Sequence, residues 1–287
     1  MKITIFTPTY NRAHTLPKVY ESLVAQTSKN FEWILVDDGS TDGTEELIKS
    51  YVSENKIDIK YYKQPNQGKH IAINTGLDYA QGDYFLVLDS DDHLADRCVV
   101  QLLHLISKIE KDDSIAGVTF IRSLMKDVDT SKFGNFETFD SEAYQWEEVK
   151  GEMSFCYKTS ILKNYKFPKF EGERFCPESL IHNRIGQSYK VLYTDNILAF
   201  GAYLEGGLTS NFYSLLLNNP RYSMLWYKEK INTAHFRKEK KNLYANAYWD
   251  IALKAKHIPW REKIFGIPIF WTIKFFVSKF KKRLGFG

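Results

Sequence analysis

Short apolar stretches alternate with amphipathic stretches along the first 115 residues of the chain. The apolar stretches are uninterrupted and rich in β-branched or aromatic side chains, which is typical of buried strands. We expect such strands at residues 3–7, 31–36, 57–63 and 84–88. In the amphipathic stretches, apolar positions recur three or four residues apart, as on one face of a helix. We expect helices at residues 12–26, 43–54, 69–80 and 94–109.

The alternation also indicates the fold class. Strands that are apolar on both sides belong in a parallel sheet whose two faces are covered. The sequence therefore predicts an α/β fold, with a mainly parallel central sheet and helices on both faces. In such a sheet, ligands bind beyond the carboxyl ends of the strands. Polar residues and acids do follow the first, second and fourth expected strands.

After residue 115 the pattern becomes weaker. We expect strands at residues 115–121, 155–162 and 191–199, a helix at 178–188, and helices from residue 213 onward. Residues 123–144 are polar and contain glycine, so we expect a loop with short strands there. The organisation that follows is a domain at residues 1–210, with halves at 1–115 and 116–210, and a mostly helical C-terminal extension at 211–287.

Composition narrows the class of protein. The chain has 287 residues, 44% of them hydrophobic, so it is globular. A net charge of +4 is too small to indicate nucleic-acid binding. Three cysteines without metal-like spacing fit a reducing compartment, and the N-terminus lacks the pattern of a signal peptide. Since no run of 18 apolar residues occurs, we expect a cytoplasmic protein without a spanning helix.

The C-terminal tail differs from the rest of the chain. Residues 264–283 mix aromatic side chains with a basic end, and from Arg261 onward seven lysines and arginines face one acid, Glu262. Such segments lie in the membrane interface, where the cations meet anionic lipid. Lys274 and Lys279 interrupt the tail too often for it to span a bilayer. We expect peripheral membrane contact through residues 264–283; the alternative is a helix packed on the rest of the protein.

Three carboxylates follow the fourth expected strand within four residues, at Asp89, Asp91 and Asp92. Like charges this close raise each other's pKa or require a cation. Hard divalent cations such as Mg²⁺ take oxygen ligands and substrate phosphates. The cluster therefore suggests a metal–phosphate site. From this segment alone, an acidic turn that caps the following helix is an equally open reading.

Four motifs together resemble one family. They are TPTYNR at residues 7–12, VDDGSTD at 36–42, NQGK leading into AINTG at 66–76, and DSDD at 89–92. In this order and spacing the chain resembles the family 2 glycosyltransferases, inverting enzymes with the GT-A fold. The resemblance makes residues 1–210 the catalytic domain, with a nucleotide-binding half at 1–115 and an acceptor half at 116–210.

The resemblance also assigns a donor site. It implies that Tyr10 flanks the base, that Asp38 accepts the N–H of uracil and so favours a UDP-sugar, and that Lys69 offsets diphosphate charge. Asp91 would hold Mn²⁺ or Mg²⁺ while Asp89 contacts the sugar or ribose. The implied nucleotide-sugar contacts are Pro8, Thr9, Tyr10, Asp37, Asp38, Lys69, Asp89 and Ser90. The alternatives are a plain Asp-Gly-Ser turn at Asp37 and Asp38 and a solvated lysine at the helix start.

An inverting transferase needs a base for the acceptor hydroxyl. The resemblance places it at Glu178, six residues before Arg184, which would brace the helix. The chain departs from the family pattern, because Pro177 stands where a first acid is expected and the base is Glu rather than Asp. The alternative role for Glu178 is a first-turn glutamate favoured by the helix dipole, and Glu173 is the second candidate base. Asp92 and His93 are further candidates near the metal.

The activity implied is transfer of a sugar to a hydroxyl of a glycan or lipid-linked glycan, in biosynthesis of surface polysaccharide, lipopolysaccharide or capsule. A phosphoacceptor α/β domain, such as a receiver or a haloacid-type phosphatase, places its strand-end acids after the first strand, which is not the pattern here. A catalytically degenerate protein acting as a membrane-associated scaffold is the non-enzymatic alternative; the acids at 89, 91 and 178 speak against it.

Overall fold

The computed structural model describes residues 1–123, 152–201, 211–233 and 236–283, and shows two compact units. The first comprises Met1–Lys169 and Ile181–Leu204; the second comprises Phe170–Leu180 and Glu205–Gly287. The chain therefore enters the second unit twice. From sequence, residues 170–180 were expected in the acceptor half of the first domain, and the boundary was expected at 210.

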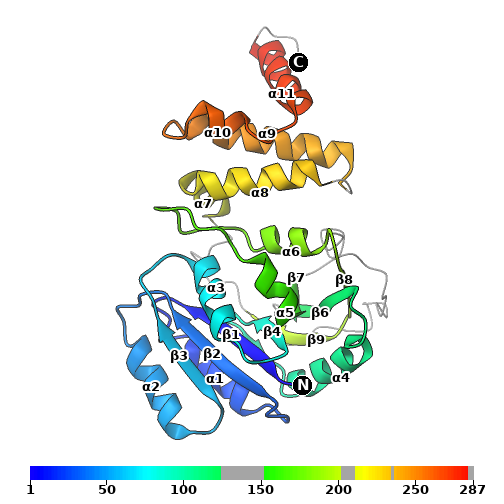
Figure 1. Cartoon of the computed structure of the whole chain (residues 1–287). Helices are drawn as coiled ribbons and strands as arrows, with labels where there is room; N and C mark the ends of the chain where they lie inside the picture. Colours follow the sequence, from blue (N-terminus) through cyan, green and yellow to red (C-terminus); the bar gives the residue numbers. More distant parts are fainter. Residues whose placement is uncertain (124–151, 202–210, 234–235, 284–287) are drawn as a thin grey trace. The chain divides into compact units, whose positions relative to one another are not determined.

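The first unit is built on a mixed sheet (Figure 1). Its parallel strands are β1 (Ile3–Thr9), β2 (Phe31–Asp37), β3 (Ile59–Lys63) and β4 (Tyr84–Val87). β4 then pairs antiparallel with β7 (Glu152–Lys158), which pairs antiparallel with β6 (Ile115–Ser123). β6 also runs parallel to β8 (Lys190–Leu192) and β9 (Ile197–Phe200), and β5 (His93–Leu94) pairs antiparallel with β9. The mainly parallel α/β sheet is the architecture that the sequence predicts.

Helices cover both faces of the sheet, because adjacent residues of each buried strand point to opposite sides. On one face Ile3 and Ile5 of β1 join a core with α1 (Leu16–Val24), α2 (Thr44–Glu54) and α4 (Cys98–Ile109). On the other face, α3 (Lys69–Tyr79) packs closely on β1. A Cβ at Gly76 would lie 2.3 Å from the ring of Phe6, so the helix approaches the strand closely only because residue 76 is glycine. This packing explains Gly76 without a role in binding.

Several boundaries differ from those expected from sequence. The helix expected at 94–109 begins at Cys98, because His93 and Leu94 pair with β9 instead. The strand expected at 155–162 ends at Lys158 and continues as the short helix α5 (Thr159–Leu162), followed by a 3₁₀ turn at Lys163–Tyr165. The strand expected at 191–199 is two strands, β8 and β9. The helix expected at 178–188 is shorter, α6 (Ser179–Ile185).

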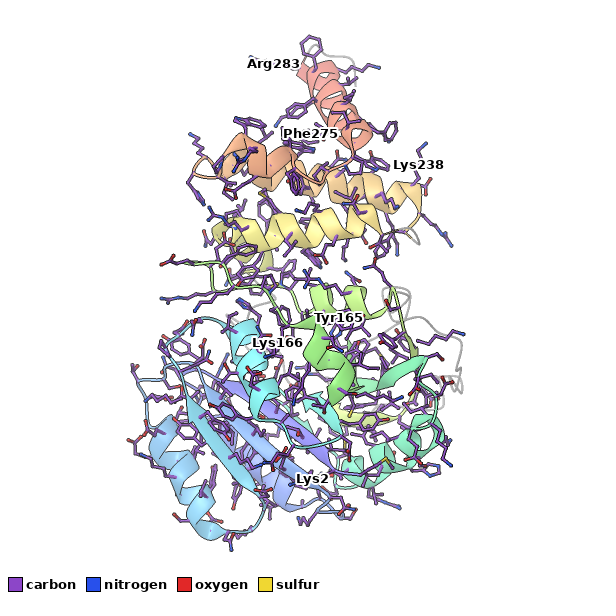
Figure 2. The ribbon with its side chains drawn as sticks, in the orientation of Figure 1. Lys2, Tyr165, Lys166, Lys238, Phe275 and Arg283 are labelled. Carbon is purple, nitrogen blue, oxygen red and sulfur yellow. The ribbon has the colours of Figure 1, made fainter. Side chains whose placement is uncertain are left out.

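The C-terminal part of the second unit is mostly helical in its described residues, whereas residues 170–178 form no helix. It contains α7 (Phe212–Asn218), α8 (Pro220–Asn232), α9 (Lys238–Lys254), α10 (Trp260–Ile264) and α11 (Ile269–Arg283). On α11, Phe275 faces α9, where its ring stacks on Trp249 at 6.2 Å between centroids, and Arg283 ends the helix (Figure 2). Within the described parts of the chain, no helix combines the length and apolarity needed to cross a membrane.

Side-chain hydrogen bonds attach Phe170–Leu180 to the start of α8. The buried Glu173 carboxylate accepts the N–H groups of Arg221 at 2.9 Å and Tyr222 at 3.1 Å, two donors that lack a helical partner. Asn219 accepts in turn from the Arg174 and Phe175 N–H groups at 2.7 and 3.0 Å. Burial raises the pKa of Glu173 despite these hydrogen bonds. This segment therefore belongs to the C-terminal unit through specific polar contacts.

The buried carboxylate of Glu32 stabilises the end of the first unit's sheet that lies opposite the carboxyl ends of its parallel strands. Glu32 of β2 is fully buried; it accepts from Thr4 Oγ1 at 2.6 Å, the Gln81 N–H at 2.7 Å and Lys60 Nζ at 2.6 Å. Burial alone would raise the pKa of Glu32, but the hydrogen bonds from Lys60, Thr4 and Gln81 outweigh it and lower the pKa. Glu32 thus stabilises the fold as an ionised group.

We predict that Glu32→Gln lowers the free energy of unfolding at pH 7 by about 1–3 kcal/mol, the usual range for a lost charged hydrogen bond. Because the folded-state pKa is lowered, the stabilisation is present above the ordinary pKa of about 4.3 and is lost as the pH falls through the folded-state value. Urea unfolding of both proteins between pH 3 and pH 7 measures this. A difference that stays constant below pH 4 would contradict it.

Candidate functional site

The carboxyl ends of β1 and β2 lie side by side and their loops are tied together. Thr9 pairs with Asp37 in the register, and the Asp38 N–H donates to the Thr9 carbonyl at 2.8 Å. Asn11 adopts a left-handed conformation (φ 54°), which Asn tolerates better than most residues. Its side-chain oxygen accepts the Thr41 N–H at 2.8 Å. The two loops therefore form one fixed rim.

Three predicted donor-site residues sit on this rim with different exposure. Pro8 and Thr9 are buried in the last positions of β1, whereas Tyr10 is 48% exposed. An exposed aromatic ring beside a polar rim is available to stack on a base. The geometry is thus compatible with the expected role of Tyr10, while Pro8 and Thr9 can contribute backbone rather than side-chain contacts.

Asp37 and Asp38 are both buried but differ in how their oxygens are used. Asp37 accepts the Ser40 N–H and the Tyr61 hydroxyl, each at 2.7 Å. Burial, and then the hydrogen bond to Asp37, raise the pKa of Tyr61. The turn reading therefore describes Asp37 well, because both of its oxygens hold the protein's own groups.

Asp38 organises the loop that leads into α3. Its Oδ1 accepts from Gln64 Nε2 at 2.7 Å and the Gln67 N–H at 2.9 Å, and its Oδ2 accepts the Gly68 N–H at 2.7 Å. Gly68 has φ 95°, a conformation that favours glycine. A carboxylate offers about four acceptor positions, so Asp38 Oδ2 retains one for the N–H of a ligand.

Lys69 is the first residue of α3 and connects this loop to the acidic cluster. Its Nζ lies 2.5 Å from Asp89 Oδ1, and both side chains are partly exposed. A lysine in this position lowers the repulsion among the acids, and it is placed to meet an anion that approaches them.

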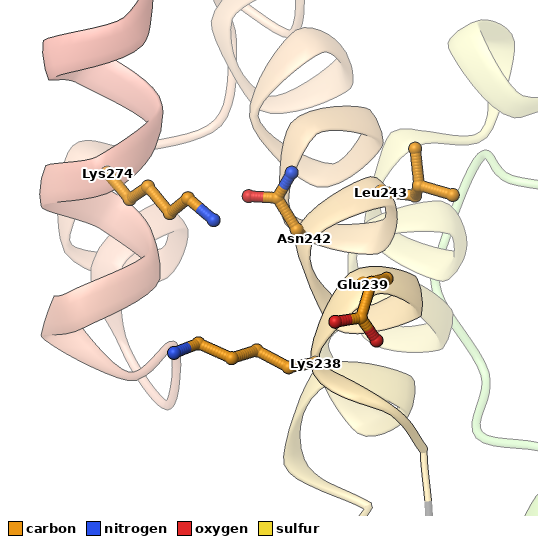
Figure 3. Close-up of a pocket in the computed structure, with 5 residues that line it drawn as sticks. All are labelled: Lys238, Glu239, Asn242, Leu243 and Lys274. Carbon is orange, nitrogen blue, oxygen red and sulfur yellow. The ribbon is translucent and has the colours of Figure 1, made fainter.

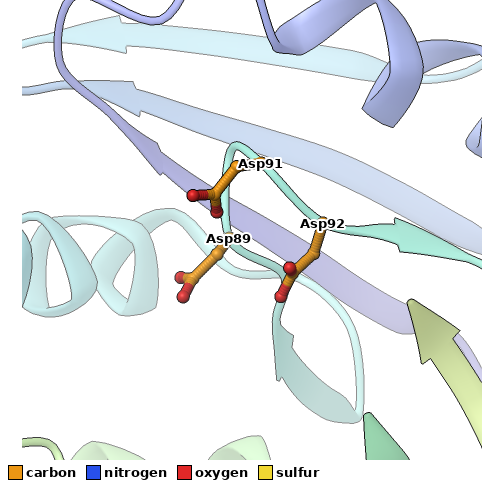
Figure 4. A group of neighbouring side chains, drawn as sticks. All are labelled: Asp89, Asp91 and Asp92. Carbon is orange, nitrogen blue, oxygen red and sulfur yellow. The ribbon is translucent and has the colours of Figure 1, made fainter. Parts of the chain in front are cut away.

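The acids converge as the sequence predicts. Asp89, Asp91 and Asp92 each place an oxygen within 4.8 Å of the others (Figure 4), and in the described residues they are the group that could hold a metal ion. Asp89 and Asp91 are partly exposed, whereas Asp92 and Ser90 are buried. An all-carboxylate set suits hard cations such as Mg²⁺ or Mn²⁺, so the residues present fit such an ion.

Asp92 pairs with Arg122, a residue that was not predicted from sequence to belong to the site. Arg122 of β6 donates through Nε to Asp92 Oδ2 at 2.5 Å and through Nη2 to Oδ1 at 2.7 Å, while its Nη1 contacts Glu152. Burial, only partly offset by Arg122, raises the pKa of Asp92 to about 6. The feature of the sequence that could have revealed Arg122 is an arginine near the end of an otherwise apolar strand. The alternative reading, an acidic turn that caps the following helix, does not hold, since α4 begins at Cys98 after Arg97.

The remaining candidates are Glu178, the expected base, and the further candidates His93, Glu173 and Arg184. His93 belongs to β5, with its ring 5.4 Å from that of Phe200, and is not part of the converging acidic group in the described residues. Glu173 uses its carboxylate to cap α8, which leaves it poorly suited to act as a base. Glu178 is half-buried directly before α6, in the segment assigned to the second unit, and Arg184 is half-buried in the part of α6 assigned to the first.

Two large aromatic side chains of the kind that stack on sugars belong to the core. Tyr157 is 2% exposed and Trp226 is 9% exposed, with the Trp226 indole donating to Ser179 at 2.9 Å. Neither ring is therefore available to an acceptor sugar.

Comparison with known proteins identifies the family. Residues 4–166 match the family described as Glycosyl transferase family 2. Glycosyltransferase GlyA of Streptococcus pneumoniae is 33% identical over 183 residues, 61% of this chain and 26% of GlyA. GalNAc(5)-diNAcBac-PP-undecaprenol beta-1,3-glucosyltransferase of Campylobacter jejuni is 28% identical over 178 residues, 58% of this chain and 54% of that enzyme. The chain thus spans about a quarter and about half of these relatives.

Solved structures show the same fold. TarS of S. aureus in complex with UDP-GlcNAc superposes with a TM-score of 0.60 over 89% of this chain and 73% of that chain, at 21% identity. The mannosyltransferase PcManGT of Pyrobaculum calidifontis, in complex with GDP-Man and Mn²⁺, gives 0.60 over 88% and 73%, at 18% identity. Since the family match covers more than half of its residues, the chain belongs to glycosyl transferase family 2, and its fold is the GT-A fold.

Proposed function

We propose that the chain transfers a sugar from a UDP-sugar to a hydroxyl of a glycan or lipid-linked glycan, with inversion at the anomeric carbon. The observation that carries this proposal is the convergence of Asp89, Asp91 and Lys69 beside the rim formed by Asp38 and Tyr10. Complexes of fold neighbours support it, since TarS binds UDP-GlcNAc and PcManGT binds GDP-Man with Mn²⁺.

On the donor side, each residue has a distinct task. Asp38 Oδ2 accepts the uracil N–H with its remaining acceptor position, and the Tyr10 ring flanks the base. Asp91 holds Mn²⁺ or Mg²⁺, and Asp89 contacts the sugar or ribose once Lys69 turns toward the diphosphate. The ion, when bound, neutralises charge that develops on the leaving diphosphate. The clustered acids thus serve to bind an anion by way of a cation.

On the acceptor side, Glu178 is the proposed base. Its carboxylate removes the proton of the acceptor hydroxyl as that oxygen bonds to the anomeric carbon, and the bond from this carbon to the UDP oxygen breaks in the same displacement. Glu178 stands where the family pattern places its acid, and the second candidate, Glu173, is engaged by α8. No covalent intermediate on the protein is required.

The C-terminal helices supply the proposed contact with a membrane. Exposed apolar residues of α11 follow helical spacing along one stripe, at Ile269, Ile273, Phe276 and Phe280. Trp271 is buried, and the rings of Phe275 and Phe276 both lie against Trp249 of α9. Phe265, before α11, is 74% exposed. Exposed apolar patches of this kind mark interaction surfaces. The neighbouring lysines make an anionic bilayer on the cytoplasmic face the complementary partner.

A groove in the second unit strengthens the preference for anionic lipid. It is lined by Lys238, Glu239, Asn242 and Leu243 of α9 and by Lys274 of α11, and both lysine side chains extend into the space between the helices (Figure 3). Two ammonium groups beside an amide suit a headgroup phosphate. Such contact would bring the enzyme to a lipid-linked acceptor, the class to which the Campylobacter jejuni relative's undecaprenol-linked substrate belongs.

We predict that wild-type protein binds UDP in the presence of Mn²⁺, and that Asp91→Ala weakens this binding at least 100-fold because the ion loses its main ligand. Isothermal titration with and without Mn²⁺ measures the effect. Asp78→Ala, which removes an exposed acid of α3, is the control and should leave the affinity unchanged. Failure of wild-type protein to bind any nucleotide sugar would favour the scaffold alternative.

We predict that Glu178→Gln lowers kcat about 10²–10⁴-fold, the range for loss of a general base, while the dissociation constant for UDP stays the same. UDP release assays with acceptor, together with UDP titration, separate the two quantities. Glu171→Gln, at an exposed glutamate nearby in sequence, is the matched control. Full activity of Glu178→Gln would show that another group removes the proton.

We predict that the protein co-sediments with vesicles containing phosphatidylglycerol and much less with vesicles of phosphatidylcholine. Ile269→Glu with Ile273→Glu should abolish sedimentation, because two charges would enter the apolar stripe. Val52→Glu, at an exposed apolar residue of α2, controls for added charge. If the stripe instead joins two copies of the chain, the double variant will change the mass measured by light scattering and leave vesicle binding as it was.

A further inference from the structure

We propose that Arg122 is a positioning residue for the metal-binding turn, and that it acts through Asp92. This inference rests on the proposed function, because it assumes that Asp91 holds a divalent ion. Arg122 does not belong to any of the motifs that identify the family. It reaches the turn from β6, a strand 30 residues further along the chain.

The contact is a two-point clamp rather than a simple attraction. Nε and Nη2 of Arg122 meet the two oxygens of Asp92, which fixes both the position and the rotation of the carboxylate. Glu152 of β7 holds the third nitrogen, Nη1, and Arg122 pairs with Glu152 in the β6–β7 register. The guanidinium therefore cannot turn without breaking contacts on two sides.

Backbone hydrogen bonds hold the acidic turn on both sides, and Arg122 holds Asp92 between them. Before the turn, the Leu88 N–H donates to the Phe6 carbonyl at 2.8 Å. After it, His93 and Leu94 pair with Phe200 and Ala199 of β9, a strand that also pairs with β6 beside Arg122. The end of the turn and Arg122 are thus linked through β9, which pairs with both β5 and β6. Displacement of Asp92 would be transmitted to Asp91 through a single peptide unit.

Gly201 indicates that the space around this pair is filled. A Cβ at Gly201 would lie 2.2 Å from Arg122 Nη2 and 2.3 Å from Asp92 Oδ1, and the Gly201 N–H donates to the Ser123 carbonyl at 2.9 Å. The backbone at residue 201 therefore lies directly against the clamp. Any side chain at residue 201 would displace Arg122 or Asp92 from their contact.

The contact with Arg122 gives Asp92 a different role from Asp89 and Asp91. Asp92 is buried and neutralised by Arg122, which leaves the partly exposed Asp89 and Asp91 to face a ligand. Groups that orient metal ligands typically affect metal affinity 10–100-fold when they are removed. Arg122 is such a group, one step removed from the ion.

The charge of Arg122 and its positioning role have opposite effects on cation binding, so a variant can separate them. Arg122→Met removes a positive charge near the acids, which by Coulomb attraction alone would tighten the binding of a cation. Loss of positioning has the opposite effect. We expect Arg122→Met and Arg122→Lys each to weaken Mn²⁺ binding 10–100-fold, measured by electron paramagnetic resonance of free Mn²⁺ on the full chain.

Further variants separate positioning from folding. Gly201→Ala leaves every charge in place and should also weaken Mn²⁺ binding, whereas Gly43→Ala, where a Cβ meets no atom of the described structure within 4 Å, should not. Asp92→Asn should match Arg122→Met, and the double variant should be no weaker than either, since both act through one contact. Near-UV circular dichroism restricts the comparison to folded proteins.

The outcomes distinguish this inference from the proposed function. Unchanged or tighter Mn²⁺ binding by folded Arg122→Met and Gly201→Ala, beside a wild type that binds the ion, would overturn the role of Arg122 alone. Absence of Mn²⁺ binding by the wild type would overturn the metal-dependent function and this inference with it. Weaker binding in Arg122→Lys, Arg122→Met and Gly201→Ala, with Gly43→Ala unaffected, would establish the clamp.

Discussion

The mutual repulsion of carboxylates at one edge of the sheet is the constraint on which the rest of the site depends. Asp89, Asp91 and Asp92 approach within 4.8 Å, and each has a different surrounding. Arg122 neutralises Asp92 from the buried side, and Lys69 meets Asp89 from the start of α3. Asp91 lies within the same group and is partly exposed. The arrangement tolerates three acids and still leaves negative charge directed at an incoming ion.

The end of β2, on the other side of β1, holds its acids without cations. Asp37 and Asp38 are satisfied by N–H and hydroxyl donors from the loops that they organise, which lets both be buried. The same fold thus holds acids at two strand ends, one on each side of β1, by two means. One pair shapes the rim, and the other group remains available for an ion. This contrast is the physical reason for assigning nucleotide recognition to the first and metal binding to the second.

Local pattern predicted most of the first 115 residues, because each strand and helix there is encoded by its own periodicity. The errors arise where distant pairing decides. Leu94 is apolar and fits a helix, but β9, about a hundred residues later, takes it into a strand. Arg122 joins the acids only through the folded sheet, so spacing could not reveal it. Glu173 was a candidate base because the local sequence does not show what its carboxylate binds. Its partner, the start of α8, lies 48 residues away in sequence. The acidic cluster was predictable because its members are adjacent in the chain.

The division of the chain separates the proposed donor and acceptor functions. The donor residues lie in the first unit, whereas Glu178 belongs to a segment held to α8 of the second unit, the same unit that carries the apolar stripe of α11. Glu178, the proposed base, and the proposed membrane contact are therefore assigned to the same compact unit.

Anomalous diffraction from crystals grown with UDP and Mn²⁺ tests directly whether the acidic turn binds the donor through a metal ion. We expect an anomalous peak for an ion bonded to a carboxylate oxygen of Asp91 and to oxygens of the diphosphate. The uracil ring should lie beside Tyr10, with its N–H donating to Asp38. UDP bound with its phosphates away from the acidic turn, or an ion bound elsewhere, would contradict it.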